Sequence, residues 1–394
     1  MTMPVARSTR LPADLSPNRL SAAVARVRAS GRALVDLTES NPTRAGLPYP
    51  PDLLAMLASS EALAHDPQPF GRESARAAVA ADFARRGVEV SPSRICLSAS
   101  TSEAYAWLFK LLCEPGDRVL VPRPSYPLFE HLTALECVEA SPYELEQHGH
   151  WRIDVAALER QIDERTRAVL VVSPNNPTGS VLHPDELATL AEVCAERGLV
   201  LIGDEVFSDY RFDAGLPAPS VVQQTRAVAV SLGGLSKSVG LPQVKLAWLA
   251  VGGPADGADA LMAGLEIVAD TFLSVSTPAQ VALPSLLERG AVVREAIRAR
   301  TARNLEALHA AVAAVPAVTL LSPDGGWCAV LQVPSVRSEE QLVLDLLEYD
   351  GVLVHPGYFF DIPREAFVVV SLLVPPDAFD RGLACLLARA TEAP

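Results

Sequence analysis

Lys237 is the residue whose surroundings in the sequence most clearly predict chemistry. It lies in the Gly/Ser-rich segment Ser231-Leu-Gly-Gly-Leu-Ser-Lys-Ser-Val-Gly240, after a short apolar stretch. A lysine amine that is removed from water loses part of its proton affinity and becomes a nucleophile near neutral pH. Because such an amine condenses with aldehydes, the sequence predicts that Lys237 forms a Schiff base.

Two polar side chains follow apolar stretches upstream of this lysine. Asp204 comes after Leu199-Val-Leu-Ile202, and Asn176 lies in the turn sequence Asn175-Asn-Pro-Thr-Gly179. An aspartate at a strand end can keep a pyridine nitrogen protonated, and an amide can donate a hydrogen bond to a phenolic oxygen. Taken singly, these residues are also compatible with a helix cap and a plain turn. Together with Lys237, they match what pyridoxal phosphate requires of a protein.

The phosphate of this cofactor needs hydroxyl groups, backbone N–H groups and a positive charge. Ser100-Thr-Ser-Glu103 opens a helical stretch with the Ser-x-x-Glu pattern of a capping box, and the free N–H groups of a helix start bind phosphate. Capping alone also accounts for this motif. Tyr126 is predicted to stack on the cofactor ring. The residues predicted to bind the phosphate are Ser100, Thr101, Ser102, Ser236 and Lys245.

These side chains need a regular framework, and the sequence predicts an α/β fold. Short Val/Leu/Ile runs alternate with helical stretches between about residues 117 and 251, and their continuous apolarity indicates strands that are covered on both faces. We therefore expect a large domain with a mostly parallel sheet sandwiched by helices. The stretch 184–197 is predicted to be a helix, because proline begins it and Gly198 follows its end.

The pattern changes after about residue 255. Long Ala/Leu/Arg-rich helical stretches are followed by a hairpin around Asp324-Gly-Gly326 and by further strands, which predicts a smaller α+β C-terminal domain. The expected division has three parts: an N-terminal arm over residues 1–45 that joins the small domain, a large cofactor-binding domain over 46–275, and a small domain over 276–394.

The order and spacing of the motifs resemble those of class I/II, fold-type I pyridoxal-phosphate-dependent aminotransferases, over nearly the whole chain. The matching landmarks are Pro124-x-Tyr126-Pro127, Asn175-Asn-Pro-Thr-Gly179, Asp204-Glu-Val206 and Ser236-Lys237. The resemblance implies that Lys237 carries the internal aldimine and moves the substrate proton, that Asp204 pairs with the pyridinium, and that Asn176 holds the 3-oxygen. It also implies a homodimer with active sites at the subunit interface.

Three departures from the family's pattern concern the cofactor. Phe207 stands where a tyrosine usually donates to the 3-oxygen, so the aldimine loses one partner and its pKa is expected to rise. Gly234 replaces a common phosphate-binding serine. Lys245 stands in place of an arginine, which keeps the charge but loses the planar two-pronged contact. Cofactor binding is expected to survive these changes.

A fourth departure concerns the substrate. Val369 takes the place of the arginine that binds the substrate α-carboxylate in this family. Either another arginine performs this task, or the substrate is not an ordinary α-amino acid. The nearest candidates are Arg364, Arg72 and Arg44.

The leading interpretation is transamination between a small-molecule amino donor and a keto acceptor. Because one fold hosts several outcomes of the same chemistry, a lyase that performs β-elimination is the alternative. An aminotransferase-like sensor domain of a transcription regulator is a third interpretation. It is disfavoured because the catalytic motifs begin early and the chain is acidic.

Bulk properties exclude other classes of protein. The formal net charge of −14 argues against a nucleic-acid surface, and no stretch approaches the 18 apolar residues of a membrane span. The N-terminus does not read as a signal peptide, and the six cysteines are spread singly, so we expect a cytoplasmic enzyme. The histidines lack metal-ligand spacing, so no metal site is expected.

Overall fold

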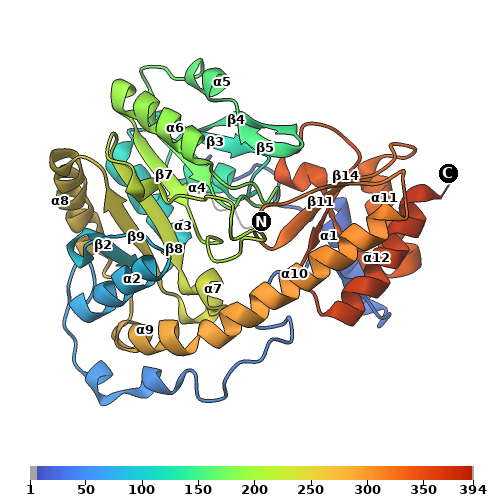
Figure 1. Cartoon of the computed structure of the whole chain (residues 1–394), viewed down its shortest axis with the longest axis horizontal. Helices are drawn as coiled ribbons and strands as arrows, with labels where there is room; N and C mark the ends of the chain where they lie inside the picture. Colours follow the sequence, from blue (N-terminus) through green and yellow to red (C-terminus); the bar gives the residue numbers. More distant parts are fainter. Residues whose placement is uncertain (1–6, 393–394) are drawn as a thin grey trace, which may run out of the picture.

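An eight-stranded sheet is the centre of the larger part of the molecule in the computed structural model, which describes residues 7–392 (Figure 1). Strands β8, β7, β6, β3 and β4 run parallel, whereas β2 with β9, β9 with β8 and β4 with β5 are antiparallel. The predicted mostly parallel sheet is therefore confirmed. In sheet order the strands are β2 (Ile95–Ser98), β9 (Ala247–Gly252), β8 (Ala229–Gly234), β7 (Val200–Asp204), β6 (Thr166–Val172), β3 (Arg118–Arg123), β4 (Glu139–His148) and β5 (His150–Ile153).

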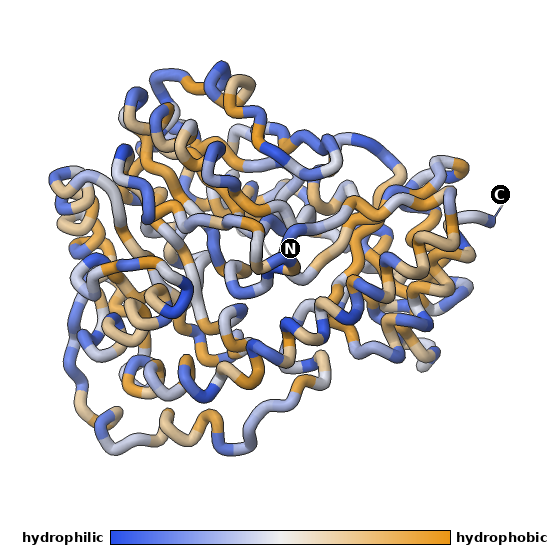
Figure 2. Tube along the Cα trace, viewed as in Figure 1, coloured by the Kyte–Doolittle hydropathy of each residue, from blue (hydrophilic) through white to orange (hydrophobic). Residues whose placement is uncertain are grey.

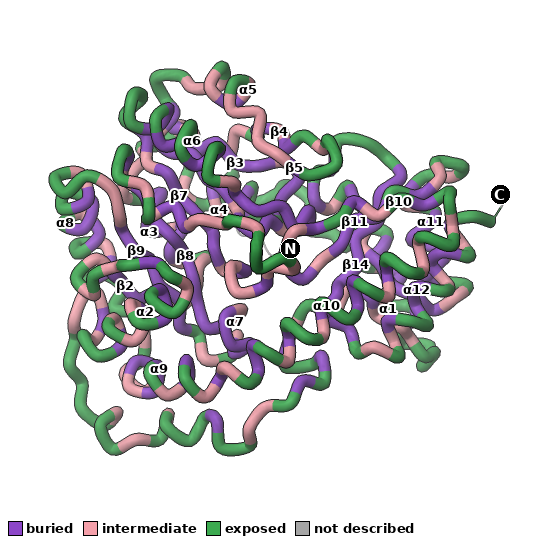
Figure 3. The backbone as a smooth tube through the Cα atoms, viewed as in Figure 1, coloured by how far each residue is buried: buried purple, intermediate pink, exposed green. Residues whose placement is uncertain are grey.

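Helices cover both faces of this sheet, which explains why its strands are apolar throughout (Figures 2 and 3). On one face, Leu108 and Leu265 pack in one cluster with Ile202 of the sheet. On the other, Leu190 packs against Leu201. The helices of this part are α2 (Glu73–Arg85), α3 (Thr101–Leu112), α4 (Phe129–Leu135), α5 (Val155–Glu159), α6 (Pro184–Arg197), α7 (Leu235–Ser238), α8 (Ala255–Phe272) and α9 (Thr277–Arg289).

Helix α6 has the bounds that its sequence signals predict. Pro184 is its first residue, the carboxylate of Glu186 accepts a hydrogen bond from the backbone N–H of His183 at 2.8 Å, and Gly198 ends it at φ 65°. A left-handed C-terminal residue favours glycine, which has no Cβ to clash with the preceding carbonyl. The predicted helix is confirmed.

A four-stranded antiparallel sheet forms the smaller part, with the order β10 (Thr319–Leu321), β11 (Cys328–Gln332), β14 (Phe367–Ser371) and β13 (His355–Pro356). The pairing of β10 with β11 confirms the predicted hairpin. One face of this sheet packs against α1 (Arg19–Ala29), α10 (Ala291–Ala313), α11 (Glu339–Asp345) and α12 (Pro376–Thr391). Strand β1 (Val35–Asp36) pairs with β12 (Val352–Leu353). The domain boundaries proposed from the sequence stay a prediction.

Backbone hydrogen bonds join the β10–β11 turn to the larger part of the molecule. The N–H of Gly325 donates to the carbonyl of Gly179 at 2.9 Å, and the N–H of Gly326 donates to that of Tyr210 at 2.7 Å. Gly179 has φ 70°, and a Cβ there would lie 2.3 Å from the Cβ of Pro323. We call these contacts the glycine seam; they set the position of Trp327, the residue that follows the turn.

No single described helix is long and apolar enough to cross a membrane. Helices α8 and α9 together have the length and apolar composition of a span, but the chain bends by 120° between them. Both also contribute buried leucines to the core, among them Leu265 and Leu283.

Candidate active site

Lys237 lies in α7, the short helix that begins where β8 ends. Its Nζ atom is 4.8 Å from the ring centroid of Trp327 and 5.4 Å from that of Phe207. Among residues 7–392, no hydrogen bond or ion pair is made by this amine. Burial lowers the pKa of Lys237 from its ordinary value because the charged form has lost its water. The half-buried side chain therefore carries an amine whose affinity for a proton is reduced.

Asp204 is the last residue of β7, the strand next to β8, so its carboxylate lies at the same edge of the sheet as Lys237. The hydroxyl of Tyr105 donates to its Oδ2 at 2.8 Å, and the N–H of Val206 donates to its Oδ1 at 3.2 Å. Burial raises the pKa of Asp204, and the Lys237 amine acts in the opposite direction. A buried carboxylate with two donors still gains from a cation brought close to it.

Asn176 lies in the turn that follows β6. The N–H of Ser173 donates to the carbonyl of Asp204 at 2.9 Å, which fixes the beginning of this turn beside the carboxylate. Asn175 stabilises the turn internally by accepting hydrogen bonds from Thr178. The Oδ1 atom of Asn176 is buried and has no hydrogen-bond partner. An amide with free capacity at a sheet edge is suited to bind a ligand.

The predicted helix start is present, with one difference in its capping. Ser100 caps α3 by accepting a hydrogen bond from the N–H of Glu103 at 3.1 Å. The Glu103 carboxylate reaches back to the N–H of Ala99 at 2.7 Å, where a capping box would use the N–H of Ser100. Tyr105, one turn further along α3, contacts Asp204, so the N-terminus of α3 lies close to this carboxylate. At that N-terminus Thr101 is half-buried and Ser102 is exposed.

The other predicted residues differ in how close they come to this centre. Tyr126 is 41% exposed, and the nearby Asp204 charge contributes to raising its pKa, although burial contributes more. Ser236 is half-buried next to Lys237. Lys245 is exposed and has φ 58°. It lies beside the lysine loop, because the N–H of Leu235 in that loop donates to the carbonyl of the next residue, Leu246, at 3.1 Å.

Sequence reasoning missed three residues that contact this centre. Tyr105 was read as part of a helical stretch, although its spacing from Thr101 puts both on one helix face. Trp327 was read as the start of a strand, and its ring lies 4.8 Å from the Lys237 amine; the half-buried Cys328 follows it directly. Both follow a Gly-Gly pair, which was the available signal for a close approach of two backbones.

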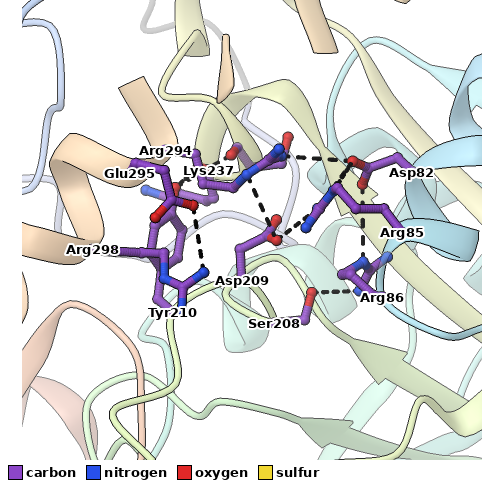
Figure 4. A network of polar contacts seen from close by, with 11 residues as sticks. Asp82, Arg85, Arg86, Ser208, Asp209, Tyr210, Lys237, Arg294, Glu295 and Arg298 are labelled. Carbon is purple, nitrogen blue, oxygen red and sulfur yellow. Dashed lines mark hydrogen bonds and ion pairs between the residues drawn. The ribbon is translucent and has the colours of Figure 1, made fainter. Parts of the chain in front are cut away.

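Tyr210, three residues after Phe207, contacts the backbone of the lysine loop. Its hydroxyl donates to the backbone carbonyl of Lys237 at 2.5 Å. The preceding residue, Asp209, belongs to a buried ion network (Figure 4): it lies 2.7 Å from Arg85, which also pairs with Asp82 at 3.0 Å. Arg294 lies 3.6 Å from Asp82 within the same network. This network holds Tyr210, and through it the lysine loop, in position.

We expect Tyr210→Phe to lower both stability and activity. It leaves a buried carbonyl without its close donor, which costs about 1–3 kcal/mol of unfolding free energy. Tyr143→Phe is a matched control, because that buried hydroxyl donates to the carbonyl of Leu170 at 2.8 Å, away from the site. Thermal unfolding should show similar losses for both variants. Only Tyr210→Phe should change kcat and its pH profile; identical kinetics would refute a positioning role.

The family of the chain follows from comparison with known proteins. The model of the family described as aminotransferase class I and II matches residues 34–383, so the chain belongs to that family. An alanine aminotransferase of Mycobacterium tuberculosis is 28% identical over 355 residues, covering 86% of this chain and 81% of that protein. A glutamate-pyruvate aminotransferase of Haemophilus influenzae is 24% identical over 347 residues, with 85% of each protein covered.

Solved structures agree on the fold. The crystal structure of an Escherichia coli aminotransferase superimposes with a TM-score of 0.87 at 23% identity, covering 99% of each chain. The fold is therefore that of the fold-type I aminotransferases, and the chain is a transaminase that moves an amino group from an amino donor to a keto acid. These matches favour transamination over the β-elimination that the sequence left open.

Proposed function

We propose that this enzyme binds pyridoxal phosphate through Lys237 and transaminates small amino compounds as a homodimer. The observation that carries the proposal is a half-buried lysine whose amine has no hydrogen-bond partner among residues 7–392, set beside a buried carboxylate at the ends of two adjacent parallel strands. Family membership supports it, because class I and II aminotransferases depend on this cofactor.

The polar groups at the site fit the cofactor. The Lys237 amine would hold its aldehyde carbon, and the Asp204 carboxylate would face the ring nitrogen. The Nδ2 amide group of Asn176 would donate to the ring oxygen, and the α3 N-terminus from Ser100 would meet the phosphate. When bound, the ring withdraws electrons from the substrate carbon and stabilises a negative charge there.

The residues of the chain supply the remaining steps. A neutral Lys237 amine would accept a proton from the substrate carbon and deliver it to the cofactor carbon, which its lowered pKa permits near neutral pH. Tyr105 fixes the Asp204 carboxylate, so that the carboxylate does not rotate away from the cation it stabilises. The rings of Phe207 and Trp327, edge-on to each other at 5.2 Å, shield the amine from water.

Rapid-mixing spectroscopy of the reconstituted enzyme tests the proposed function. A suitable amino donor should convert the bound cofactor to its pyridoxamine form, and a keto acid should reverse the change. Because relatives are named alanine and glutamate-pyruvate aminotransferases, alanine and glutamate belong in the first panel. Steady release of ammonia without the pyridoxamine form would overturn transamination.

A homodimer is supported by apolar side chains that one copy leaves exposed. Leu54, Met56 and Leu63 are 38%, 39% and 88% exposed along one segment that packs beside α9. A second copy that covers them would remove this surface from water. We expect light scattering to give twice the 41.9 kDa of one chain; a monomeric mass would refute the dimer.

We also propose a cytoplasmic location. The six cysteines are all free, which suits a reducing compartment. Fractionation of the native host should recover the enzyme with cytoplasmic markers, and recovery with secreted proteins would contradict this.

A further inference from the structure

A polar cavity of about 260 Å³ opens beside the loop that follows β7. Four arginines from three separate segments line it: Arg85 and Arg86 at the end of α2, Arg211 in that loop, and Arg298 on α10. Figure 4 shows Arg85 and Arg86 on one side of Asp209 and Arg298 on the other. Guanidinium groups that gather around one cavity are suited to bind an oxyanion, because their N–H groups match its oxygens.

The cavity is separate from the centre around Lys237. Asp204 and Glu205 follow each other at the end of β7, so their side chains point to opposite faces of the sheet. Asp204 meets Tyr105 of α3 on one face, whereas Glu205 lines the cavity on the other. A ligand in this cavity would therefore not occupy the proposed cofactor site.

The arginines that the sequence offered for a substrate carboxylate do not take part in this cavity. Arg364 is exposed and lines another surface cavity with His148. Arg72 lies 3.9 Å from Asp66, and Arg44 is exposed in a turn. The four guanidinium groups of the cavity are therefore additional to those candidates.

The guanidinium groups are held in place by contacts that use only part of their donors. Arg86 donates from Nη1 to the hydroxyl oxygen of Ser208 at 2.6 Å, and it lies 4.6 Å from the ring centroid of Phe83. Its buried Nε atom has no hydrogen-bond partner among residues 7–392. Arg211 donates from Nη1 to the carbonyl of Leu216 at 2.8 Å. Because a guanidinium has five N–H donors, side chains held in this way can bind an oxyanion at little further cost in entropy.

The carboxylates on the lining already have partners. Asp209 lies 2.7 Å from Arg85. Glu205 accepts hydrogen bonds from the hydroxyls of Ser220 and Ser231 at 2.9 and 2.7 Å. No other acidic side chain of residues 7–392 lines the cavity. The lining therefore sets four arginines against two carboxylates.

The next layer of charge does not cancel this excess. Arg294 lies 3.6 Å from Asp82, and Glu295 lies 3.4 Å from Arg298. With these residues included, five arginines stand against four carboxylates. The pair of Arg298 with Glu295 is also largely exposed to solvent, where ion pairs contribute little. A bound anion would therefore balance the remaining positive charge and relieve repulsion between the guanidinium groups.

We propose that this cavity binds a tetrahedral oxyanion, either free phosphate or the phosphate group of a small organic ester. The donors come from three segments, which suits a group whose oxygens point in several directions better than it suits a planar carboxylate. The hydroxyl of Ser208 accepts from Arg86 and keeps its own hydrogen for a ligand. The volume exceeds that of one phosphate ion and leaves room for the carbon skeleton of an ester. The inference goes beyond the proposed function, because this site involves neither the cofactor nor the amino group.

Calorimetry on the wild-type holoenzyme, freed of excess cofactor, tests the site with phosphate, glycerol 3-phosphate and acetate. The ionic strength is held constant with chloride, because salt screens exposed charges. We expect saturable binding of phosphate or of the ester with a dissociation constant of about 1 mM or below, and acetate should bind at least about tenfold more weakly. The tighter of the two phosphate ligands identifies the source of the oxyanion. Absence of saturable binding of both, or acetate binding as tightly, would overturn the proposal.

Substitutions show where the oxyanion binds. Arg298→Gln and Arg211→Gln should each weaken binding of the tighter phosphate ligand by about tenfold or more. Arg303→Gln is the matched control on the same helix, because that arginine pairs with Asp380 at 2.7 Å and does not line the cavity. Unchanged affinity in the two cavity variants would overturn the proposal. An equal loss in Arg303→Gln would do so as well, because it would show a general effect of charge.

Thermal unfolding gives a second readout and shows that the variants fold. The phosphate ligand should raise the unfolding temperature of the wild type in a saturable way, since a ligand that binds only the folded state stabilises it. This rise should be lost in Arg298→Gln. Without ligand, that variant should unfold close to the wild-type temperature, because the Arg298 side chain is 45% exposed. None of these measurements depends on turnover, so failure of this site would leave the proposed function intact.

Discussion

Lys237→Ala is expected to eliminate turnover and the near-visible absorbance of the bound cofactor. The variant lacks the half-buried amine that lies beside Trp327 and Phe207 at this edge of the sheet, so it has neither the covalent attachment nor the group that moves the substrate proton. We expect a loss of several orders of magnitude in kcat. Spectra and turnover of the reconstituted variant are the measurements.

The small number of lysines in the chain makes it simple to identify the one that binds the cofactor. Only three lysines are present: Lys110, Lys237 and Lys245. Borohydride reduction of the holoenzyme should attach the cofactor to Lys237, and peptide mass spectrometry distinguishes the three. Lys110→Ala is the control, because that amine pairs with Glu136 at 2.5 Å on the surface of α3. Label on another lysine, or retained turnover in Lys237→Ala, would refute the assignment.

Asp204→Asn should weaken activity and stabilise the protein without cofactor. Loss of the charge opposite the ring nitrogen should lower kcat on the order of 100-fold or more, as for other preorganised electrostatic groups. Burial raises the pKa of Asp204 above its ordinary 3.8, so the folded protein holds this proton more tightly than the unfolded chain. The contribution of the Asp204 proton to the unfolding free energy is therefore fully present below pH 3.8, and it is lost as the pH rises through the pKa of the folded state.

Thermal unfolding of the cofactor-free protein at two pH values checks the sign. Asp204→Asn should unfold at a higher temperature than wild type at pH 7, and the difference should vanish at low pH. Asp117→Asn is the opposite control, because a backbone donor at Glu114 lowers the pKa of that carboxyl. It should destabilise at pH 7. A lower unfolding temperature for Asp204→Asn at pH 7 would contradict the raised pKa.

Local signals in the sequence predicted the regular elements well. Proline, acids and Gly198 bracket α6, and the Asp-Gly-Gly turn marks the β10–β11 hairpin. Each of these depends on backbone preferences within a few residues. The antiparallel edge formed by β2 and β9 was not predicted, because pairing direction leaves no trace in an apolar run that is buried on both faces.

The surroundings of the lysine were only partly predictable. Tyr105 meets Asp204 across 99 residues, and Trp327 meets the lysine amine across a similarly long stretch of the chain. Tyr210 contacts the backbone of Lys237 rather than a ligand, so its role depends on how two loops pack. Such contacts depend on how distant elements pack, which no local pattern encodes.

The glycine seam fixes a residue of the smaller sheet beside the reacting amine. The turn that carries Trp327 is bonded to Gly179 and Tyr210, and these belong to the loops after β6 and β7. A Cβ at Gly179 would lie 2.5 Å from the carbonyl of Gly325, and one at Gly325 would lie 2.6 Å from that of Tyr210. Either change would displace the turn and with it the Trp327 ring, 4.8 Å from the Lys237 amine. The surroundings of the lysine therefore depend on glycines in distant segments of the chain.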